Sequence, residues 1–369
     1  MRIGTITFWD TEDNYGQVLQ CFALIKYLES RGHQVQLVKT DQSDLYEQSY
    51  IHKLYTLLDM VIHPSRFFNR KKCGETQKSQ THKARFVDRY FSDFKKKYIP
   101  STEKIYTFRE LCKADLGLNA VVCGSDQVWS GFSKLMFLQF PGTFKRISYA
   151  ASFGGVRPKN GWDKKNVRSW LKSFDLITVR EKEGVEICGA LKAKAYMVPD
   201  PTLLLGKIEY DKLIETPKEV REEEYILLYL LGNEMKVTVE EIMAFAKSKH
   251  LKVKYVASQN RVDELGKEYP TIGEWLYLMS HASYFITNSF HGTVFSMIFH
   301  KPFMTIPLSG KTARMNGRIA DLLTDSGLEE RIFTGSFETL FKPLDFDKFE
   351  ENKRRGIVKV NNLLEETGL

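Results

Sequence analysis

The fold is decided by residues 2–38, whose sequence is RIGTITFWDTEDNYGQVLQCFALIKYLESRGHQVQLV. Residues 2–8 are an apolar run typical of a strand, and a polar loop leads from Asp10 to Gly16. Apolar side chains then recur at helical spacing until Gly32, and a second apolar run follows at 34–38. This order predicts a parallel strand-helix-strand layer. The apolar positions of the helix are Val18, Leu19, Phe22, Ile25 and Leu28.

The same alternation continues along the chain in two blocks. The segment 199–201, PDP, stiffens the chain after the first block, and the charged stretch 218–224 precedes the next apolar run. The sequence therefore predicts an α/β fold with two Rossmann-like domains, at 1–203 and 204–345, and a C-terminal helix at 346–369. Ligands of such domains bind in the cleft at the carboxyl ends of the strands. Further strands are expected at 120–123, 146–151, 176–179, 195–198, 225–231, 252–257, 284–287 and 303–306, and further helices at 164–174, 182–191, 272–281 and 293–300.

Length and composition are those of a folded protein with two domains. The chain has 369 residues, of which 43% are hydrophobic and 27% are charged. This length exceeds the size at which a single core stops growing. The first apolar run is too short for a signal peptide, and no later stretch is long enough to span a membrane. We therefore expect a cytoplasmic protein.

Positive charge is concentrated between residues 52 and 100. This segment has twelve Lys and Arg and four Asp and Glu, a net charge of +8, which equals the net charge of the whole chain. Aromatic side chains are interleaved with the cations, which favours a basic helical segment at 43–110. Its basic face is either a solvated surface or a docking surface for an anionic acceptor or for anionic lipids at the inner face of the membrane. No nucleic-acid partner is expected, because no motif that recognises nucleic acids accompanies the charge.

The five cysteines predict neither a disulfide framework nor a zinc site. They are odd in number, scattered, and lack CxxC spacing. No group of Cys and His has the spacing of zinc ligands. We expect buried free thiols, no metal and no cofactor. The cysteines are Cys21, Cys73, Cys112, Cys123 and Cys188.

Residues 287–293, TNSFHGT, carry the strongest signal for chemistry. An apolar strand ends there in a polar turn before an apolar helix, so that free N–H groups and the helix dipole suit a phosphate or a carboxylate. Ser289 adds a hydroxyl donor, Gly292 permits close approach of a ligand, and His291 can transfer a proton. The alternative is that Asn288 or Ser289 only caps the helix and that His291 is an ordinary polar residue.

Residues 121–129, VVCGSDQVW, form a second polar turn after an apolar strand. Asp126 is a candidate general base for an acceptor hydroxyl, while Gln127 and Trp129 can contact a sugar by hydrogen bonding and stacking. The alternative is an ordinary turn with a buried tryptophan. Residues 14–17, NYGQ, form a third polar turn on the same expected rim.

Two groups of cations can complete an anion site. Arg180 follows the expected strand at 176–179, and its planar guanidinium can hold a phosphate or a carboxylate. A local surface role beside Glu181 agrees equally well with the sequence. A basic cluster after residue 307 faces either the cleft or the solvent, and it consists of Lys311, Arg314 and Arg318.

Six short motifs occur in order along the chain: NYGQVLQ at 14–20, GSDQVW at 124–129, YAASFG at 149–154, VRE at 179–181, PDPT at 199–202 and SFHGT at 289–293. Together they resemble the polysaccharide pyruvyl transferase family, with a weaker similarity at 318–328. Nothing between about 43 and 110 matches a motif of the family. The resemblance implies a two-domain fold of the glycosyltransferase B type, with phosphoenolpyruvate in the interdomain cleft and no required metal.

The resemblance also implies which residues bind the donor. An arginine similar to Arg180 and a segment similar to 289–291 hold phosphoenolpyruvate in the family. We therefore expect donor contacts from Arg180, Ser289, Phe290 and Gly292. Some relatives have an arginine at the position of Ser289, and a nearby cation such as Arg314 can substitute for it.

The enol chemistry of this donor suggests roles for the polar turns. His291 is the candidate acid or phosphate stabiliser, and Asp126 is the candidate base. The acceptor is expected to be a sugar of a polysaccharide or of its lipid-linked precursor. Its expected contacts are Asn14, Tyr15, Gln127 and Trp129.

Two other functions agree with the same residues. One is a nucleotide-sugar glycosyltransferase of the same architecture, which would also need an anion site in its second domain. The other is a non-catalytic glycan- or membrane-binding protein that uses the basic segment 52–100.

Overall fold

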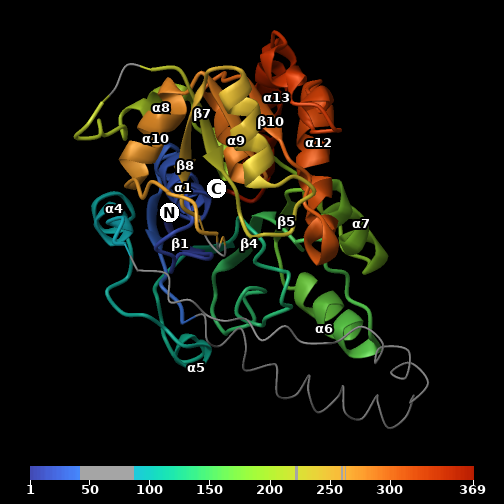
Figure 1. Ribbon diagram of the computed structural model, residues 1–369. Helices are drawn as coiled ribbons and strands as arrows, with labels where there is room; N and C mark the ends of the chain where they lie inside the picture. The colour runs from blue at the N-terminus through green and yellow to red at the C-terminus, as the bar shows by residue number, and fades with distance from the viewer. Residues whose placement is uncertain (42–86, 221–222, 259–260, 262) are drawn as a thin grey trace.

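The computed structural model describes residues 1–41, 87–220, 223–258, 261 and 263–369 (Figure 1). Most of the expected basic helical segment, residues 43–86, lies outside the described residues. The proposed docking surface within 52–100 can therefore be followed only from residue 87 onward.

The first half of the chain forms a six-stranded sheet in the order β2-β1-β3-β4-β5-β6. All neighbouring strands are parallel. Both faces are covered, which is why strands such as β3 and β5 are buried at every position instead of alternating between buried and exposed residues. The strands are β1 (Arg2–Ile6), β2 (Gln34–Leu37), β3 (Ala120–Cys123), β4 (Lys145–Ala151), β5 (Leu176–Val179) and β6 (Tyr196–Met197).

The second half contains a four-stranded parallel sheet in the order β10-β9-β7-β8. Its strands fall where the sequence predicts them, within two residues at each end. The prediction of an α/β protein with two Rossmann-like sheets is confirmed. The strands are β7 (Tyr225–Tyr229), β8 (Lys252–Val256), β9 (Tyr284–Thr287) and β10 (Phe303–Thr305).

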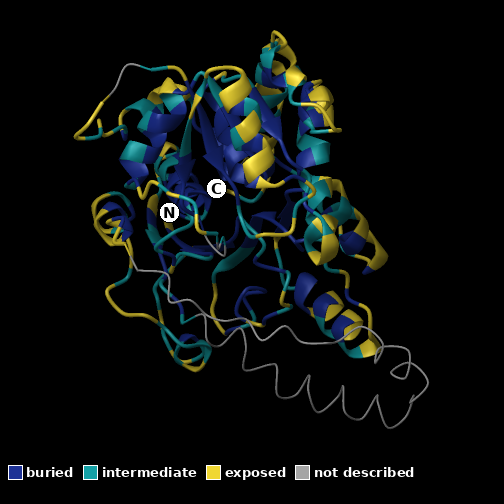
Figure 2. Ribbon diagram, viewed as in Figure 1, coloured by how far each residue is buried: buried dark blue, intermediate teal, exposed yellow. Residues whose placement is uncertain are grey.

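Helices cover the sheets, with their buried sides against the strands and their exposed sides outward (Figure 2). Several helices begin at a side-chain cap. The cap of α9 is a capping box formed by Thr238 and Glu241, and that of α10 is a capping box formed by Thr271 and Glu274. The longer helices are α1 (Tyr15–Ser30), α6 (Gly161–Leu171), α7 (Lys182–Ala190), α9 (Val239–Ser248), α10 (Ile272–His281), α11 (Phe290–Ile298), α12 (Gly317–Ser326) and α13 (Asp347–Glu366). Shorter ones are α4 (Phe91–Tyr98), α5 (Phe108–Leu111), α8 (Lys207–Asp211) and the 3-10 turns η1 (Pro201–Leu204), η2 (Gly310–Asn316), η3 (Glu329–Arg331) and η4 (Glu338–Phe341).

Helix α1 joins the two halves. Twelve of its sixteen residues are buried, as expected for a helix that is covered on more than one side. The ring of Tyr15 stacks on Trp275 of α10 with centroids 5.1 Å apart and meets Tyr229 of β7 edge to face. Its hydroxyl donates a hydrogen bond of 2.7 Å to the carbonyl of Pro270. The halves therefore share one apolar core.

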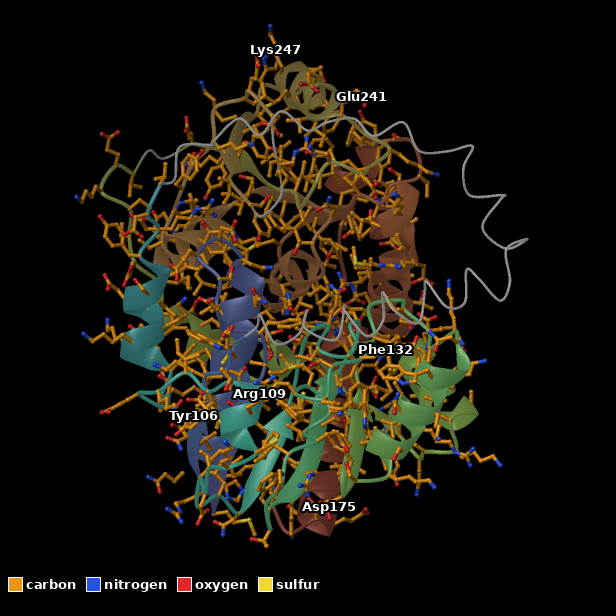
Figure 3. All side chains as sticks on the ribbon, turned by 90° about the horizontal axis from the view of Figure 1, so that it is seen from below. Tyr106, Arg109, Phe132, Asp175, Glu241 and Lys247 are labelled. Carbon is orange, nitrogen blue, oxygen red and sulfur yellow. The ribbon has the colours of Figure 1, made fainter. Side chains whose placement is uncertain are left out.

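Two further sets of polar contacts connect distant parts of the chain. Near its C-terminus the chain returns to the first half, where Arg31 donates hydrogen bonds to Asn361 of α13, at 2.7 Å, and to the carbonyl of Leu369, at 3.0 Å. At the other side, Lys182 of α7 pairs with Asp325 of α12 at 3.1 Å. Figure 3 places Glu241 and Lys247 of α9 at one end of the molecule and Asp175, just before β5, at the other.

Cations at the described end of the basic segment take part in the packing. Arg89 is buried, and its guanidinium donates to the carbonyl of Ala257 at 3.0 Å, which links the halves. Lys95 forms an ion pair of 2.6 Å with Glu12, and the side chain of Lys95 is 13% exposed. These two cations are therefore not part of a free basic face. Among the described residues, no helix is long and apolar enough to cross a membrane.

The contact between Tyr15 and Trp275 predicts that the halves unfold together. We expect Trp275→Ala to lower the free energy of unfolding by about 3–5 kcal/mol, because a fully buried indole leaves a cavity. Ile208→Ala is the control, since that side chain is 69% exposed and its loss should change stability by less than about 0.5 kcal/mol. Urea unfolding followed by tryptophan fluorescence and by circular dichroism measures both. Equal stabilities of the two variants would contradict the shared core.

Candidate functional site

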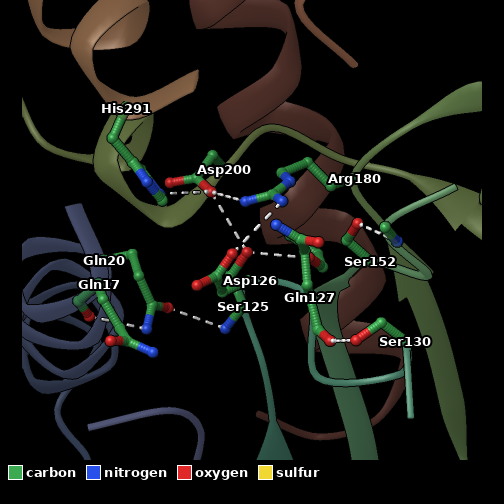
Figure 4. A network of polar contacts seen from close by, with 12 residues as sticks. Gln17, Gln20, Ser125, Asp126, Gln127, Ser130, Ser152, Arg180, Asp200 and His291 are labelled. Carbon is green, nitrogen blue, oxygen red and sulfur yellow. Dashed lines mark hydrogen bonds and ion pairs between the residues drawn. The ribbon is translucent and has the colours of Figure 1, made fainter. Parts of the chain in front are cut away.

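The site lies where the carboxyl ends of strands from both sheets meet. Asp126 follows β3, Arg180 follows β5 and Asp200 follows β6, and these three face His291, which follows β9 in the second half (Figure 4). Parallel strands bring the residues after their carboxyl ends to one edge of a sheet, which is where ligands of such folds bind. The arrangement therefore joins residues that are far apart in the sequence.

Arg180 is at the centre of this cluster, with only 2% of its side chain exposed. Its Nη1 donates a hydrogen bond of 3.0 Å to Asp200, while Asp126 and Glu181 lie 3.6 and 3.7 Å from its other nitrogens. Burial alone would lower the pKa of Arg180, but the three carboxylates outweigh it and raise the pKa. The Nε and Nη2 atoms are buried without a hydrogen-bond partner, so they remain available to a ligand.

Asp200 connects groups from different elements. Its Oδ2 accepts hydrogen bonds from Arg180 and from the hydroxyl of Ser125, at 3.0 and 3.2 Å. Its Oδ1 accepts from the N–H and the hydroxyl of Thr202, and Pro201 starts the short helix η1 that supplies them. Burial would raise the pKa of Asp200, but His291, Arg180 and the Thr202 N–H together hold it well below its usual range. Asp200 is therefore an ionised carboxylate in the interior.

The turn after β3 is shaped by Gly124. Its φ is +119°, and a Cβ at this position would lie 2.2 Å from the carbonyl oxygen of Tyr149. Glycine therefore permits a turn that other residues cannot form. Asp126 also has a positive φ, of 69°, and is fixed by the bond from the Ser152 N–H to its carbonyl. The N–H of Ser125 donates to Gln20 of α1 at 3.0 Å.

His291 reaches across from the second half to the first turn of α1. Its Nε2 lies 3.5 Å from Oδ2 of Asp200 and is buried without a hydrogen-bond partner. The imidazole fills the space that a side chain at position 16 would take, because a Cβ on Gly16 would lie 2.3 Å from Cγ and Nδ1 of the ring. Gly16 is thus required for this position of His291.

A groove beside the cluster is lined by both halves and has a volume of about 550 Å³. Arg180 and Phe290 lie on its wall, and the guanidinium of Arg180 is 4.4 Å from the centroid of that ring. The guanidinium of Arg318, on α12, is 5.6 Å from the same centroid. The helices α12 and α13 form the remaining wall (Figure 1).

A family model described as polysaccharide pyruvyl transferase matches residues 14–310. The chain belongs to the polysaccharide pyruvyl transferase family. Asp126, Arg180, Asp200 and His291 all lie within the matched residues, whereas Arg314 and Arg318 lie beyond them. The resemblance inferred from the six motifs is confirmed.

Solved structures show the same fold in other enzymes. A UDP-GlcNAc 2-epimerase from Methanocaldococcus jannaschii is 12% identical, with 99% of this chain and 100% of that one covered and a TM-score of 0.51. The UDP-N-acetylglucosamine 2-epimerase from Rickettsia bellii is 11% identical, with 99% and 96% covered and a TM-score of 0.52. The predicted glycosyltransferase B-type architecture is thereby confirmed, and identities this low show the fold alone. No curated protein gives a significant match.

Some of the predicted donor residues meet in the structure, and others do not. Arg180 and Phe290 are in contact beside His291. The Ser289 hydroxyl accepts the N–H of Gly292 and so caps α11, as the alternative interpretation had it. Gly292 permits close packing rather than ligand approach, since a Cβ would lie 2.6 Å from the Thr287 hydroxyl. Arg314 is exposed on η2, whereas Arg318 lies beside the ring of Phe290.

The predicted acceptor contacts of Trp129 and Tyr15 are corrected by the structure. Trp129 is fully buried, stacks on Phe137 at 4.7 Å, and donates its N–H to the carbonyl of Met136. Tyr15 belongs to the core between the halves. Asn14 caps α1 by accepting the N–H of Gln17. Gln127 is half-buried beside the cluster, where its amide oxygen lies against Gly154 (Figure 4).

The sequence did not point to the central role of Asp200. It lies in the PDP motif, which was interpreted as a stiff linker, although an acidic residue just after a strand was a usable signal. Gly16 and Ser125 lie within the motifs at 14–20 and 124–129, but their contacts reach across the fold, so the sequence did not show which groups they meet. Among the described residues, no group of three or more His, Cys, Asp or Glu is arranged to hold a metal ion.

The charge of Asp200 predicts a specific pH dependence. Because its pKa is lower in the folded protein than in the unfolded chain, it stabilises the fold above the unfolded value of about 3.9, and this contribution is lost as the pH falls further. We expect Asp200→Asn to cost about 3 kcal/mol at pH 7, with a smaller difference from the wild type at pH 3. Asp211→Asn, which breaks a surface pair with Lys207, should cost less than about 1 kcal/mol at either pH. Urea unfolding at both pH values tests this, and a pH-independent difference would contradict it.

Proposed function

We propose that the protein transfers the pyruvyl group of phosphoenolpyruvate to hydroxyls of a sugar in a polysaccharide or its lipid-linked precursor. The observation that carries the proposal is the meeting of Arg180 and His291 on Asp200. The two residues come from opposite halves, are both buried, and each keeps a nitrogen without a hydrogen-bond partner. Membership in the family supports pyruvyl transfer as the reaction.

Arg180 supports recognition of an anionic donor. A guanidinium offers donors in a planar fork that matches a carboxylate or a phosphate. Here Nη1 is already bonded to Asp200, while Nε and Nη2 are without a partner. Low exposure strengthens each contact, because fewer water molecules compete for the same donors. The carboxylate or phosphate of the donor would accept hydrogen bonds from Nε and Nη2.

His291 supports proton transfer to the donor. In the proposed reaction the methylene carbon of phosphoenolpyruvate takes up a proton and becomes a methyl group, which leaves an oxocarbenium-like centre at the neighbouring carbon. The side chain of His291 is about one-tenth exposed, and Asp200 lies within 3.5 Å of its Nε2. His291 is therefore the group that we propose as the acid in this step.

Asp126 is the proposed base for the sugar. A first hydroxyl adds to the electron-poor carbon as it loses its proton, phosphate leaves with its bonding electrons, and a second hydroxyl closes a cyclic ketal. One of the two hydroxyl protons replaces the proton given to the methylene carbon, and the other leaves on phosphate. Asp126 is 13% exposed and lies beside Arg180, so it can reach a bound sugar from within the cluster.

The direct test is incubation with phosphoenolpyruvate and a panel of nitrophenyl and lipid-linked sugars. We expect release of inorganic phosphate together with a mass gain of one pyruvyl group on an acceptor. UDP-GlcNAc in place of phosphoenolpyruvate is the second arm, and transfer of its sugar without pyruvyl transfer would refute the proposal. Phosphate release alone, without a modified sugar, would also count against it.

Replacement of His291 should abolish transfer without unfolding the protein. We expect His291→Ala to reduce the turnover rate by about 10²–10⁴-fold, the usual contribution of a general acid. The matched control is His281→Ala, at an exposed histidine of α10, which should keep full activity. Circular dichroism confirms the fold of both variants. Wild-type turnover in His291→Ala would remove this residue from the mechanism.

Gly16 gives an independent test of the imidazole position. Alanine at this position should leave α1 helical but displace the ring of His291, and misplacement by about 1 Å costs roughly 10²-fold in rate. Gly189→Ala is the control, because Gly189 is an exposed helical glycine with no atom within 4 Å of a built Cβ. That change should raise stability by about 0.5–1 kcal/mol and leave activity unchanged. Equal activity of the two variants would contradict the assigned position of His291.

A further inference from the structure

The positive charge of Arg180 is already compensated in the cluster. Asp126, Glu181 and Asp200 all lie within 4 Å of its guanidinium. The Nε and Nη2 atoms of Arg180 have no hydrogen-bond acceptor. The three carboxylates nevertheless repel any anion that approaches the guanidinium. A phosphate dianion therefore needs a second cation that is not paired with an acid.

Arg318 meets this requirement. Its Nε is buried without a hydrogen-bond partner, and it makes no ion pair with any residue that the structure describes. Its guanidinium and that of Arg180 both lie within 6 Å of the ring of Phe290. Burial, together with repulsion from Arg180, lowers the pKa of Arg318 to about 10. The two guanidiniums, one buried and one partly buried, lie beside the same ring, and a bound anion would relieve the repulsion between them.

The wall of the groove next to this pair has more cations than acids. Asp200 is paired with Arg180, and the other two acids on its wall, Asp321 and Asp325, lie within 4 Å of Lys182, outside the groove. The opposite wall is α13, and its lysines add charge of the same sign. These lysines are Lys348, Lys353 and Lys359.

We propose that Arg318 is a donor-binding residue that, together with Arg180 beside the ring of Phe290, holds a phosphate group at the wall of the groove between α12 and α13. The identification of this group as the phosphate of phosphoenolpyruvate rests on the proposed function. Arg318 lies beyond the residues that match the family model. Two guanidiniums at the departing phosphate would stabilise its charge in the transition state.

The proposed role of Arg318 also explains why this partly buried guanidinium forms no ion pair with any residue that the structure describes. A buried charge without a partner destabilises a fold, and its replacement by a neutral side chain usually restores stability. Arg331 shows the pattern of a structural arginine: it is fully buried, and it donates hydrogen bonds of 2.9 Å to the carbonyls of Lys342 and Pro343. Ligand binding and stability should therefore respond in opposite directions when Arg318 is replaced.

The experiment measures binding rather than transfer. Isothermal titration and thermal shift with inorganic phosphate, phosphoenolpyruvate and UDP are carried out on the wild type, Arg318→Gln, Arg318→Lys and Arg314→Gln. We expect Arg318→Gln to weaken binding of phosphate and phosphoenolpyruvate by about 10–100-fold, as for the loss of a charge-assisted pair, and Arg318→Lys to recover part of it. Arg314→Gln, at an exposed arginine of η2, should bind as the wild type does. Without ligand, Arg318→Gln should melt at or above the wild-type temperature.

The outcomes separate this inference from the proposed function. Wild-type affinity for phosphate in Arg318→Gln, or no binding of phosphate by the wild type, would overturn it. A lower melting temperature of Arg318→Gln without ligand, with affinity unchanged, would make Arg318 a structural residue and would overturn it as well. Binding of UDP alone that depends on Arg318 would overturn the assignment to a phosphate monoester. Phosphate binding that depends on Arg318, in a protein that transfers no pyruvyl group, would support the anion site and refute only the proposed reaction.

Discussion

The site depends on one buried carboxylate, that of Asp200. It holds Arg180 from β5, Ser125 from the turn after β3 and the imidazole of His291 from the second half. A carboxylate without exposure is stable in the interior only if donors satisfy it, and five donor atoms from four other residues surround this one. The same interaction that stabilises Asp200 therefore fixes the relative positions of the groups that are proposed to bind and protonate a donor.

The packing of α1 makes this arrangement possible. Tyr15 and the neighbouring Gly16 come from one turn of α1, and they contact Trp275 and His291 of the second half. Stacked rings fix the distance between the halves, while the absent side chain at Gly16 leaves space for the imidazole. Because these contacts are apolar and buried, the two halves meet as parts of one core, and His291 is in place before any ligand binds.

The sequence predicted the sheets well because buried parallel strands are continuous apolar runs, as at 120–123 and 284–287. It also located the polar turns that follow them, since those turns are local features. It could not separate residues that face the cluster from those that face the core. Trp129 and Asp126 are three residues apart in one turn, yet one packs on Phe137 and the other lies beside Arg180. Only long-range packing decides between them, just as it decides between Arg314 and Arg318.

The balance of charge around Arg180 explains why the proposed donor site contains a second arginine. Three carboxylates surround Arg180, which keeps it ionised and in place but leaves little attraction for an incoming anion. Arg318 is close enough to be repelled by Arg180, so it is the less stable of the two cations and gains more from a ligand. In the proposed site Arg180 therefore fixes the geometry of the donor contacts, and Arg318 supplies the additional attraction for the anion. The two arginines differ because three acids already compensate the charge of Arg180.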